Sequence, residues 1–248
     1  MKPNLSVWRV SLLPLALFGL CLFLSYWAGS WGLAEFYVLP LEKLLVRIQD
    51  PKLSLEEKEK VWKQAVVYGK HALELHPGNA EYWLHFGQLQ YIWSRQIKED
   101  TVRASALLQE AVVSYETAAR LRPTWGYTWI NLAQVRMVQG RDHWPESVLH
   151  LERAMVFAPW EPSVQLNVVR LGFTLWSSLE ERLQNDILNV ALRVMGHSPH
   201  QVLELVKRHG KKDNILPLVR FQPTLRAEFD KYFGIVSSGE KEIVKERP

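Results

Sequence analysis

The chain has 248 residues, of which 48% are hydrophobic and 23% are charged, a composition typical of one or two globular domains. The formal net charge is +4, and Lys2 and Arg9 supply two of these charges, so the rest of the chain carries about +2. So small a charge argues against a nucleic-acid-binding protein. The single cysteine, Cys21, excludes an internal disulfide and a cysteine-rich metal site.

The first predicted element is a membrane-spanning helix near the N-terminus. The 25 residues between Arg9 and Glu35 carry no charge, and as a helix they would extend about 37 Å, more than the roughly 30 Å of a hydrocarbon core. Aromatic residues flank this run, where their rings favour the headgroup zone: Trp8 on one side, and Tyr26, Trp27 and Trp31 on the other. We therefore expect a transmembrane anchor within residues 1–34.

A cleaved signal peptide is the alternative interpretation of this segment, with the small residues 28–30 as the cleavage site. The apolar run is long for a signal peptide, and the bulky Trp27 crowds that site, so the sequence favours an uncleaved anchor. Lys2 and Arg9 precede the span. The positive-inside rule then predicts a cytoplasmic N-terminus and a soluble part on the other side of the membrane.

Helices are expected to follow a juxtamembrane connector over residues 35–53, in which Pro40 is expected to begin a new helix. Ser54 and Glu57 have the spacing of a capping box, in which the two side chains satisfy free amides at a helix start. Apolar residues then recur at helical intervals until Pro77 and Gly78 end that helix. No stretch alternates with a period of two residues, so a sheet is not expected.

A set of residues recurs with one spacing in three places. Three groups follow steps of four, three and five residues: Ala65, Gly69, Ala72 and Pro77; Ala111, Tyr115, Ala118 and Pro123; Ser147, Leu151, Ala154 and Pro159. Trp83 and Trp129 lie six residues after the first two prolines, and Gly87 and Ala133 lie ten residues after them. Small residues at fixed places let paired helices approach closely, so the pattern predicts a series of helical hairpins.

At these positions the sequence resembles the tetratricopeptide repeat family, whose pattern of Trp, Leu, Gly or Ala, Ala, an aromatic, Ala and Pro extends over 34 residues. One copy reads Trp129, Leu132, Ala133, Ser147, Leu151, Ala154 and Pro159, and an earlier copy reads Trp83, Phe86, Gly87, Ala111, Tyr115, Ala118 and Pro123. The resemblance implies an all-α protein in which an α-α superhelix of repeat hairpins, over residues 54–196, follows the transmembrane helix.

The repeat departs from its regular spacing in two places. About 12 extra residues lie near residues 93–106, and two more lie around residues 141–143. A third helix pair, over residues 163–196, is weaker, because Gln165 and Val169 replace the tryptophan and the small residue. Capping helices are expected over residues 197–234, and the tail over residues 235–248 is expected to be disordered.

The repeat pattern also predicts where the tryptophans lie. Trp83 and Trp129 occupy the repeat position at which an indole packs between helices, and a ligand-stacking pocket is the alternative. Six others fall outside that position, and we expect them to seal repeat interfaces or to be exposed at a partner surface: Trp62, Trp93, Trp125, Trp144, Trp160 and Trp176.

Several longer stretches are similar to a narrower family. The segments "WGLAEFY", "LRPTWGYTWINLA", "APWEPSVQL" and "ALRVMGHSPHQVLELVKRHG" resemble membrane-anchored repeat proteins associated with bacterial exopolysaccharide biosynthesis (VpsP-like). The resemblance implies a scaffold with protein partners in polysaccharide polymerisation or export. It also implies a single-pass protein of the bacterial inner membrane with a periplasmic repeat domain. A repeat subunit of another envelope assembly, such as cytochrome maturation or secretion, is the alternative.

Catalytic and cofactor motifs are not found in the sequence. It contains no glycine-rich phosphate loop, no Gly-x-Ser-x-Gly elbow and no His-Glu-x-x-His motif. His143 and His150 could share a helix face, but no carboxylate completes a metal site with them. Glu180 and Glu181 are better explained by the dipole of a helix that starts there than by acid–base catalysis. We therefore expect a protein that is not an enzyme, with no catalytic residue, no metal and no cofactor.

The repeat resemblance implies a concave groove lined by the first helix of each hairpin. The partner-binding hypothesis rests on Gln88, Tyr91, Tyr127, Asn131, Gln134, Asn167 and Arg170, and the other groove positions are Leu84, Ile130, Met137, Leu166 and Phe173. Asn131 and Asn167 are equivalent positions, from which an amide can bond an extended peptide backbone through both donor and acceptor. The alternative is that asparagine is simply common there.

A basic cluster ends the short helix that starts at Ser198 and Pro199 and reaches His209, with Gly210 as its stop. Its members are Lys207, Arg208, Lys211 and Lys212. A solvated helix end, favoured by the helix dipole, is one interpretation, and contact with acidic glycan or lipid headgroups is the other.

Overall fold

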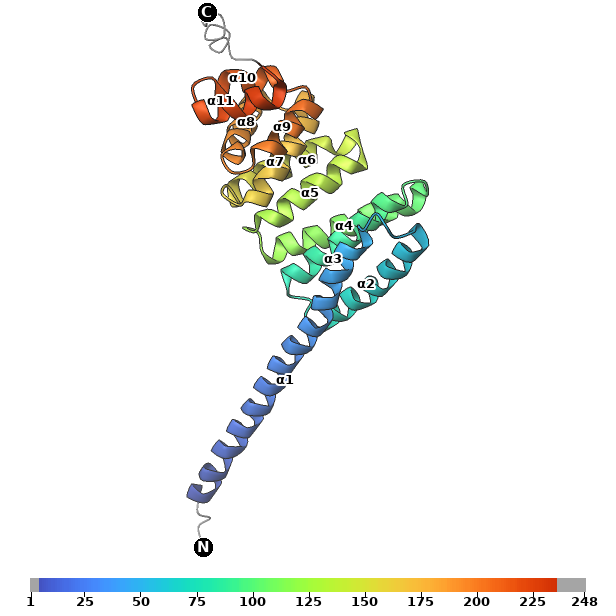
Figure 1. Ribbon diagram of the computed structural model, residues 1–248. Coiled ribbons are helices and arrows are strands. Elements are labelled where there is room, and N and C mark those ends of the chain that lie inside the picture. Colours follow the sequence, from blue (N-terminus) through green and yellow to red (C-terminus); the bar gives the residue numbers. More distant parts are fainter. Residues whose placement is uncertain (1–4, 236–248) are drawn as a thin grey trace, which may run out of the picture. The chain divides into compact units, whose positions relative to one another are not determined.

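A computed structural model describes residues 5–235 of the chain, and Figure 1 shows a molecule built from helices. Within that range eleven α-helices and no β-strand are found, which confirms the all-α prediction. The helices are α1 (Leu5–Ile48), α2 (Leu55–Leu75), α3 (Ala80–Gln96), α4 (Thr101–Leu121), α5 (Gly126–Gln139), α6 (Trp144–Phe157), α7 (Pro162–Thr174), α8 (Glu181–Met195), α9 (Pro199–Arg208), α10 (Lys212–Val219) and α11 (Pro223–Phe233). Apart from Ile235, the predicted disordered tail lies outside the described residues.

The helices form two compact units, which divide after Leu121. The first unit contains α1 to α4, and the second contains α5 to α11. The first unit contains the hairpins α1–α2 and α3–α4, and the second contains the hairpins α5–α6 and α7–α8 followed by three further helices. We describe each unit by itself.

Helix α1 contains the apolar segment and then continues, without a break, into the first hairpin (Figure 1). It is long and apolar enough to cross a membrane, and its apolar part is exposed rather than buried in the fold. The expected new helix at Pro40 is wrong, because α1 runs through that residue. A proline removes one backbone donor and strains the preceding turn. Here six side chains of α1 are buried against α2 and α3, and this burial outweighs the strain: Ala34, Val38, Leu41, Leu44, Leu45 and Ile48.

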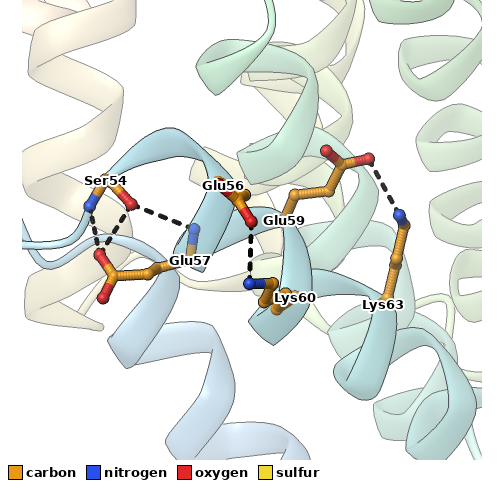
Figure 2. A network of polar contacts seen from close by, with 6 residues as sticks. All are labelled: Ser54, Glu56, Glu57, Glu59, Lys60 and Lys63. Atoms are coloured by element: carbon orange, nitrogen blue, oxygen red, sulfur yellow. Dashed lines mark hydrogen bonds and ion pairs between the residues drawn. The ribbon is translucent and has the colours of Figure 1, made fainter.

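Helix α2 begins with the predicted capping box, shown in Figure 2. The backbone N–H of Glu57 donates to Ser54 Oγ at 3.3 Å, and the backbone N–H of Ser54 donates to Glu57 Oε2 at 2.8 Å. The Ser54 hydroxyl also donates to Glu57 Oε2 at 2.7 Å, and this bond, followed by the one from the Ser54 backbone N–H, lowers the pKa of Glu57. Lys60 pairs with Glu56 one helical turn away, at 2.9 Å. Local sequence alone therefore determines where α2 starts.

Small side chains let the helices of the first unit approach closely. A Cβ atom on Gly87 would lie 2.6 Å from the ring of Tyr115, and one on Gly69 would lie 2.7 Å from the ring of Phe86. The alanines of the repeat pattern have no exposed surface: Ala65, Ala72, Ala111 and Ala118. The repeat positions therefore pack as the pattern predicts, because only a small residue leaves room for the facing ring.

The extra residues near positions 93–106 lengthen α3 and α4, and only residues 97–100 connect the two helices. Trp93 lies in this extension, has no exposed surface and stacks on Trp62 of α2, with ring centroids 5.4 Å apart and planes 16° apart. The guanidinium of Arg103 lies 5.4 Å from the ring centroid of Trp62. The insertion therefore adds to the core of the first unit.

The second unit is built from the hairpins α5–α6 and α7–α8. Leu151 and Ala154 of α6 are fully buried beside Ala133 of α5. The hydroxyl of Ser147 donates to the backbone carbonyl of Ala133 at 2.6 Å, so a buried polar group is satisfied across the hairpin. The two extra residues around 141–143 form a single 3₁₀ turn, Arg141–His143, before α6.

Three further helices cover the end of the second unit. α9 packs on α7 and α8, and its apolar side chains Val202, Leu203 and Val206 are buried there. Gly210 follows α9 with a φ of 63°, a conformation that glycine adopts without strain, as its predicted role as a helix stop requires. α10 and α11 complete this part of the core through Ile215, Val219 and Phe229. These three helices lie within residues 197–234.

Candidate functional site

In each of three turns between hairpins, the residue six positions after a proline makes a side-chain hydrogen bond to the carbonyl of that proline. An N–H group of the downstream residue donates to the proline carbonyl in every case. The pairs are Trp83 Nε1 with Pro77 O at 2.7 Å, Trp129 Nε1 with Pro123 O at 2.7 Å, and Gln165 Nε2 with Pro159 O. Gln165 therefore keeps the function of the tryptophan that it replaces.

The repeat tryptophans are half-buried; Trp83 lines a cleft in the first unit, whereas the ring of Trp129 packs on neighbouring side chains. The ring of Trp129 stacks on His150 at 5.6 Å and on Phe157 at 6.4 Å, and the guanidinium of Arg153 lies 4.5 Å from its centroid. For Trp129, these contacts support the packing interpretation over an open ligand pocket. Trp160, which lies outside the repeat position, is 76% exposed.

Five of the seven predicted groove residues lie on α5 and α7, which pack against each other in the second unit. Tyr127, at the start of α5, donates its hydroxyl proton to Glu161 Oε1 at 2.6 Å and accepts from Ser163 Oγ at 3.0 Å. The hydrogen bond to Glu161 raises the pKa of Tyr127. Tyr127 is therefore fixed to the α6–α7 turn, and its ring remains half-buried.

Each of the two equivalent asparagines uses one amide N–H within its own helix. Asn131 Nδ2 donates to the carbonyl of Tyr127 at 2.7 Å, and Asn167 Nδ2 donates to the carbonyl of Ser163 at 2.9 Å. Arg170 Nη2 donates to Asn167 Oδ1 at 2.6 Å. Asn131 Oδ1 makes no hydrogen bond within residues 5–235, and its Nδ2 has a second N–H, so the amide still offers a donor and an acceptor, as the sequence suggests.

The remaining groove residues, Gln88 and Tyr91, lie half-buried on α3 in the first unit. Gln88 Oε1 is 3.4 Å from Nδ1 of His85. Three other positions that the repeat resemblance assigns to the groove do not line one, because they are only 3–4% exposed: Leu84, Ile130 and Phe173. Their side chains are therefore buried in the core rather than exposed in a groove.

The predicted basic cluster at the end of α9 makes separate contacts within the second unit. Arg208 pairs with Glu204 at 2.6 Å. Lys211 Nζ lies 4.2 Å from the ring centroid of Trp176, and its pKa is lowered by burial. Lys212 Nζ lies 5.2 Å from the ring centroid of Phe233. Three of the four cations are thus in contact with side chains of the same unit.

Two clefts were not predicted from the sequence. In the first unit, a cleft of about 660 Å³ is lined by α2, α3 and α4, including Trp62, Val66, Phe86, Leu107 and Val113. In the second unit, a cleft of about 750 Å³ is lined by residues that include Arg141, Trp144, Glu152, Ser178 and Arg182. Each cleft combines residues distant in sequence, so no local pattern marks it.

The titratable residues considered for chemistry occupy structural positions. His150 lies under Trp129, and burial, together with the charges of Arg153 and Arg136, lowers its pKa to about 4. Glu180 and Glu181 lie at the N-terminal end of α8, where the helix dipole favours negative charge. Among the residues that the structure describes, no three histidine, cysteine or acidic side chains gather as metal ligands would.

No protein-family model and no curated protein matches the chain. Among solved structures, the chain is similar to the crystal structure of TTC0263, a thermophilic TPR protein in Thermus thermophilus. The two are 18% identical, the match covers 62% of this chain and 74% of that chain, and the TM-score is 0.49. The helix bounds and packing within this chain, rather than this similarity, support the repeat assignment.

Proposed function

We propose that the chain is a non-catalytic scaffold that is anchored in the bacterial inner membrane and binds a protein partner of exopolysaccharide polymerisation or export. The scaffold role is supported mainly by the polar surface of α5 and α7. On this surface, hydrogen bonds hold Tyr127, Asn131 and Arg170 in position without burying them. Side chains held in this way lose little conformational freedom when they bind. The assignment to exopolysaccharide polymerisation or export rests on the resemblance of longer stretches of the sequence to membrane-anchored repeat proteins of that pathway.

The anchoring part of this proposal is supported by the character of α1. Its apolar segment is exposed: Leu15, Phe18, Leu22 and Phe23 are all more than half exposed. Such a surface is stable in contact with lipid and is costly in water. Residues 28–30 lie inside the continuous helix rather than in an extended segment, and this placement also favours the uncleaved anchor.

The chemistry available on α5 and α7 favours an extended polar segment of a protein partner. Asn131 Oδ1 can accept from a peptide N–H, and the guanidinium of Arg170 is a cation in the same unit. The ring of Tyr127 adds an apolar contact surface. A catalytic role finds no comparable support in these residues.

A matched pair of triple variants tests the proposal. Asn131, Asn167 and Arg170 are replaced by alanine in one variant, and the control replaces Asn185, Asn189 and Arg193, which are exposed on α8, by alanine. Both variants should accumulate in the membrane and keep their helicity. The first should fail to restore polymer production in a strain that lacks the chain, and the control should restore it. Full restoration by the first variant would contradict the proposed binding surface.

A further inference from the structure

The turn between α2 and α3 is held against α1 near the end of the charge-free run. Ser30 Oγ lies 3.2 Å from His76 Nε2, and the rings of Trp31 and His76 meet edge to face at 5.0 Å. One helical turn further along α1, Glu35 accepts a hydrogen bond from the hydroxyl of Tyr82 at 2.8 Å. All of these contacts lie within the first unit, so the turn is fixed at the height of Ser30 to Glu35.

If α1 crosses a bilayer, the part of α1 from Ser30 to Glu35 lies at the edge of that bilayer. A hydrocarbon core of roughly 30 Å needs about 20 helical residues, and the charge-free run ends immediately before Glu35. Trp27 and Trp31 are about half exposed, at 52% and 50%, and indoles favour the headgroup layer. The α2–α3 turn therefore lies beside residues that belong at the membrane surface.

The side of α1 that faces away from α2 is also apolar at this level. Leu33, Phe36 and Leu39 are 48%, 68% and 57% exposed, respectively. The outer face of a terminal repeat is normally polar, because nothing covers it. A lipid surface at this height would cover Leu33 and Phe36, and the stripe continues directly from the apolar segment of the same helix.

The turn itself is suited to a medium with less water. The carbonyl of Pro77 accepts from Trp83 Nε1 at 2.7 Å, and the carbonyl of His76 accepts from the backbone N–H of Asn79 at 3.2 Å. Satisfied carbonyls reduce the cost of leaving bulk water. Pro77 and Gly78, at the tip, are exposed and uncharged.

We infer that the α2–α3 turn, together with Trp31 and Phe36 of α1, forms a membrane-contact surface that lies in the lipid headgroup layer. This inference rests on the proposed anchoring of α1. It means that the first unit is held rigidly on the bilayer rather than at the end of a flexible connector. Helix α2 has 21 residues and would extend about 31 Å, so the α1–α2 turn at residues 49–54 lies far from the lipid.

Site-directed labelling of the full chain tests this surface. A nitroxide is attached at Gly78→Cys in a Cys21→Ala background, and the protein is reconstituted into vesicles of phosphatidylcholine and phosphatidylglycerol. A Cβ at Gly78 meets no atom within 4 Å, so the substitution fits. Lys52→Cys, at the opposite end of α2, is the matched control, and the native Cys21, labelled in a separate sample, reports on the anchor.

We expect the label at position 78 to collide more with oxygen dissolved in lipid and less with a water-soluble nickel complex than the label at position 52. The label at Cys21 should be accessible only from lipid. Equal nickel accessibility at 78 and 52, with Cys21 in lipid, would overturn the contact surface while the anchor stands. Nickel access to Cys21 would overturn the anchor and this inference together. Protection of position 78 that persists in detergent and grows with protein concentration would assign the turn to a second copy of the chain instead.

Discussion

The indole nitrogen of Trp129 donates a hydrogen bond to the carbonyl oxygen of Pro123 at 2.7 Å, and this bond ties the start of α5 to the turn that precedes it. The same bond joins Trp83 to Pro77, and a glutamine makes it to Pro159. The repeat tryptophan is therefore both a packing residue and a turn-closing donor. Because its ring is half-buried, its truncation should cost less than the loss of a fully buried aromatic.

Trp129→Phe keeps an aromatic ring but removes the donor. We expect it to lower the free energy of unfolding by about 1 kcal/mol, the usual net value of a hydrogen bond, and Trp129→Ala to lower it by about 3 kcal/mol. Urea unfolding of the chain in detergent micelles, followed by circular dichroism, measures both. Trp160→Phe, at an exposed ring, is the control and should change nothing. Equal stability of Trp129→Phe and the wild type would mean that the hydrogen bond contributes nothing.

Trp93→Ala should be the most damaging tryptophan substitution. Its ring has no exposed surface and stacks on Trp62, so its removal should leave a cavity and cost about 3–5 kcal/mol. Trp160→Ala should stay within about 0.5 kcal/mol of the wild type, because that ring is mostly exposed. The same urea titration compares the two. A larger effect at Trp160 would show that the buried extension of α3 and α4 is wrongly described.

Gly126→Ala should destabilise the second unit. The new Cβ would lie 2.2 Å from the Cβ of Ala158 and 3.1 Å from its backbone nitrogen, so the backbone itself has to move. Such overpacking costs about 1–3 kcal/mol. Gly78→Ala is the matched control, because a Cβ there meets nothing within 4 Å. Thermal melting should separate the two variants, and equal melting temperatures would contradict the close approach at the α6–α7 turn.

His150 should make the stability of the second unit depend on pH. Its pKa is lowered from 6.5 to about 4 in the folded chain, so between these values the unfolded state binds more protons than the folded state. The contribution of His150 to stability should then be fully present well above pH 6.5 and fall as the pH drops towards 4. The loss is bounded by about 3 kcal/mol, and solvent near the partly exposed ring reduces it.

The measurement is urea unfolding at several pH values between about 4 and 7, followed by tryptophan fluorescence, because His150 stacks on Trp129. His150→Gln removes the titrating group, so its curve should lack this part of the fall. An identical pH dependence in the variant and the wild type would assign the effect to other residues.

The topology of the chain can be checked independently of its partner. Lys2 and Arg9 before the span predict a cytoplasmic N-terminus. An alkaline phosphatase fused to the C-terminus should therefore be active, and a green fluorescent protein that folds only in the cytoplasm should be dark. The reverse pattern would place the repeat hairpins in the cytoplasm.

The sequence by itself determined the features that depend on neighbouring residues. The capping box at Ser54 and Glu57 needs only its own four residues, and it forms as predicted. The repeat spacing placed Gly87 where paired helices approach closely, and the ring of Tyr115 lies there. Helix content, hairpin order and the apolar helix near the N-terminus follow from the same periodic patterns.

Only the tertiary structure decided the features in which packing competes with a local preference. Pro40 was expected to begin a new helix, yet α1 continues through it because its side chains that face α2 and α3 are buried. Gln165 breaks the repeat pattern, yet it supplies the same donor to Pro159. Periodicity assigns a residue to a face, but the neighbours across that face decide which of its atoms remain available for binding.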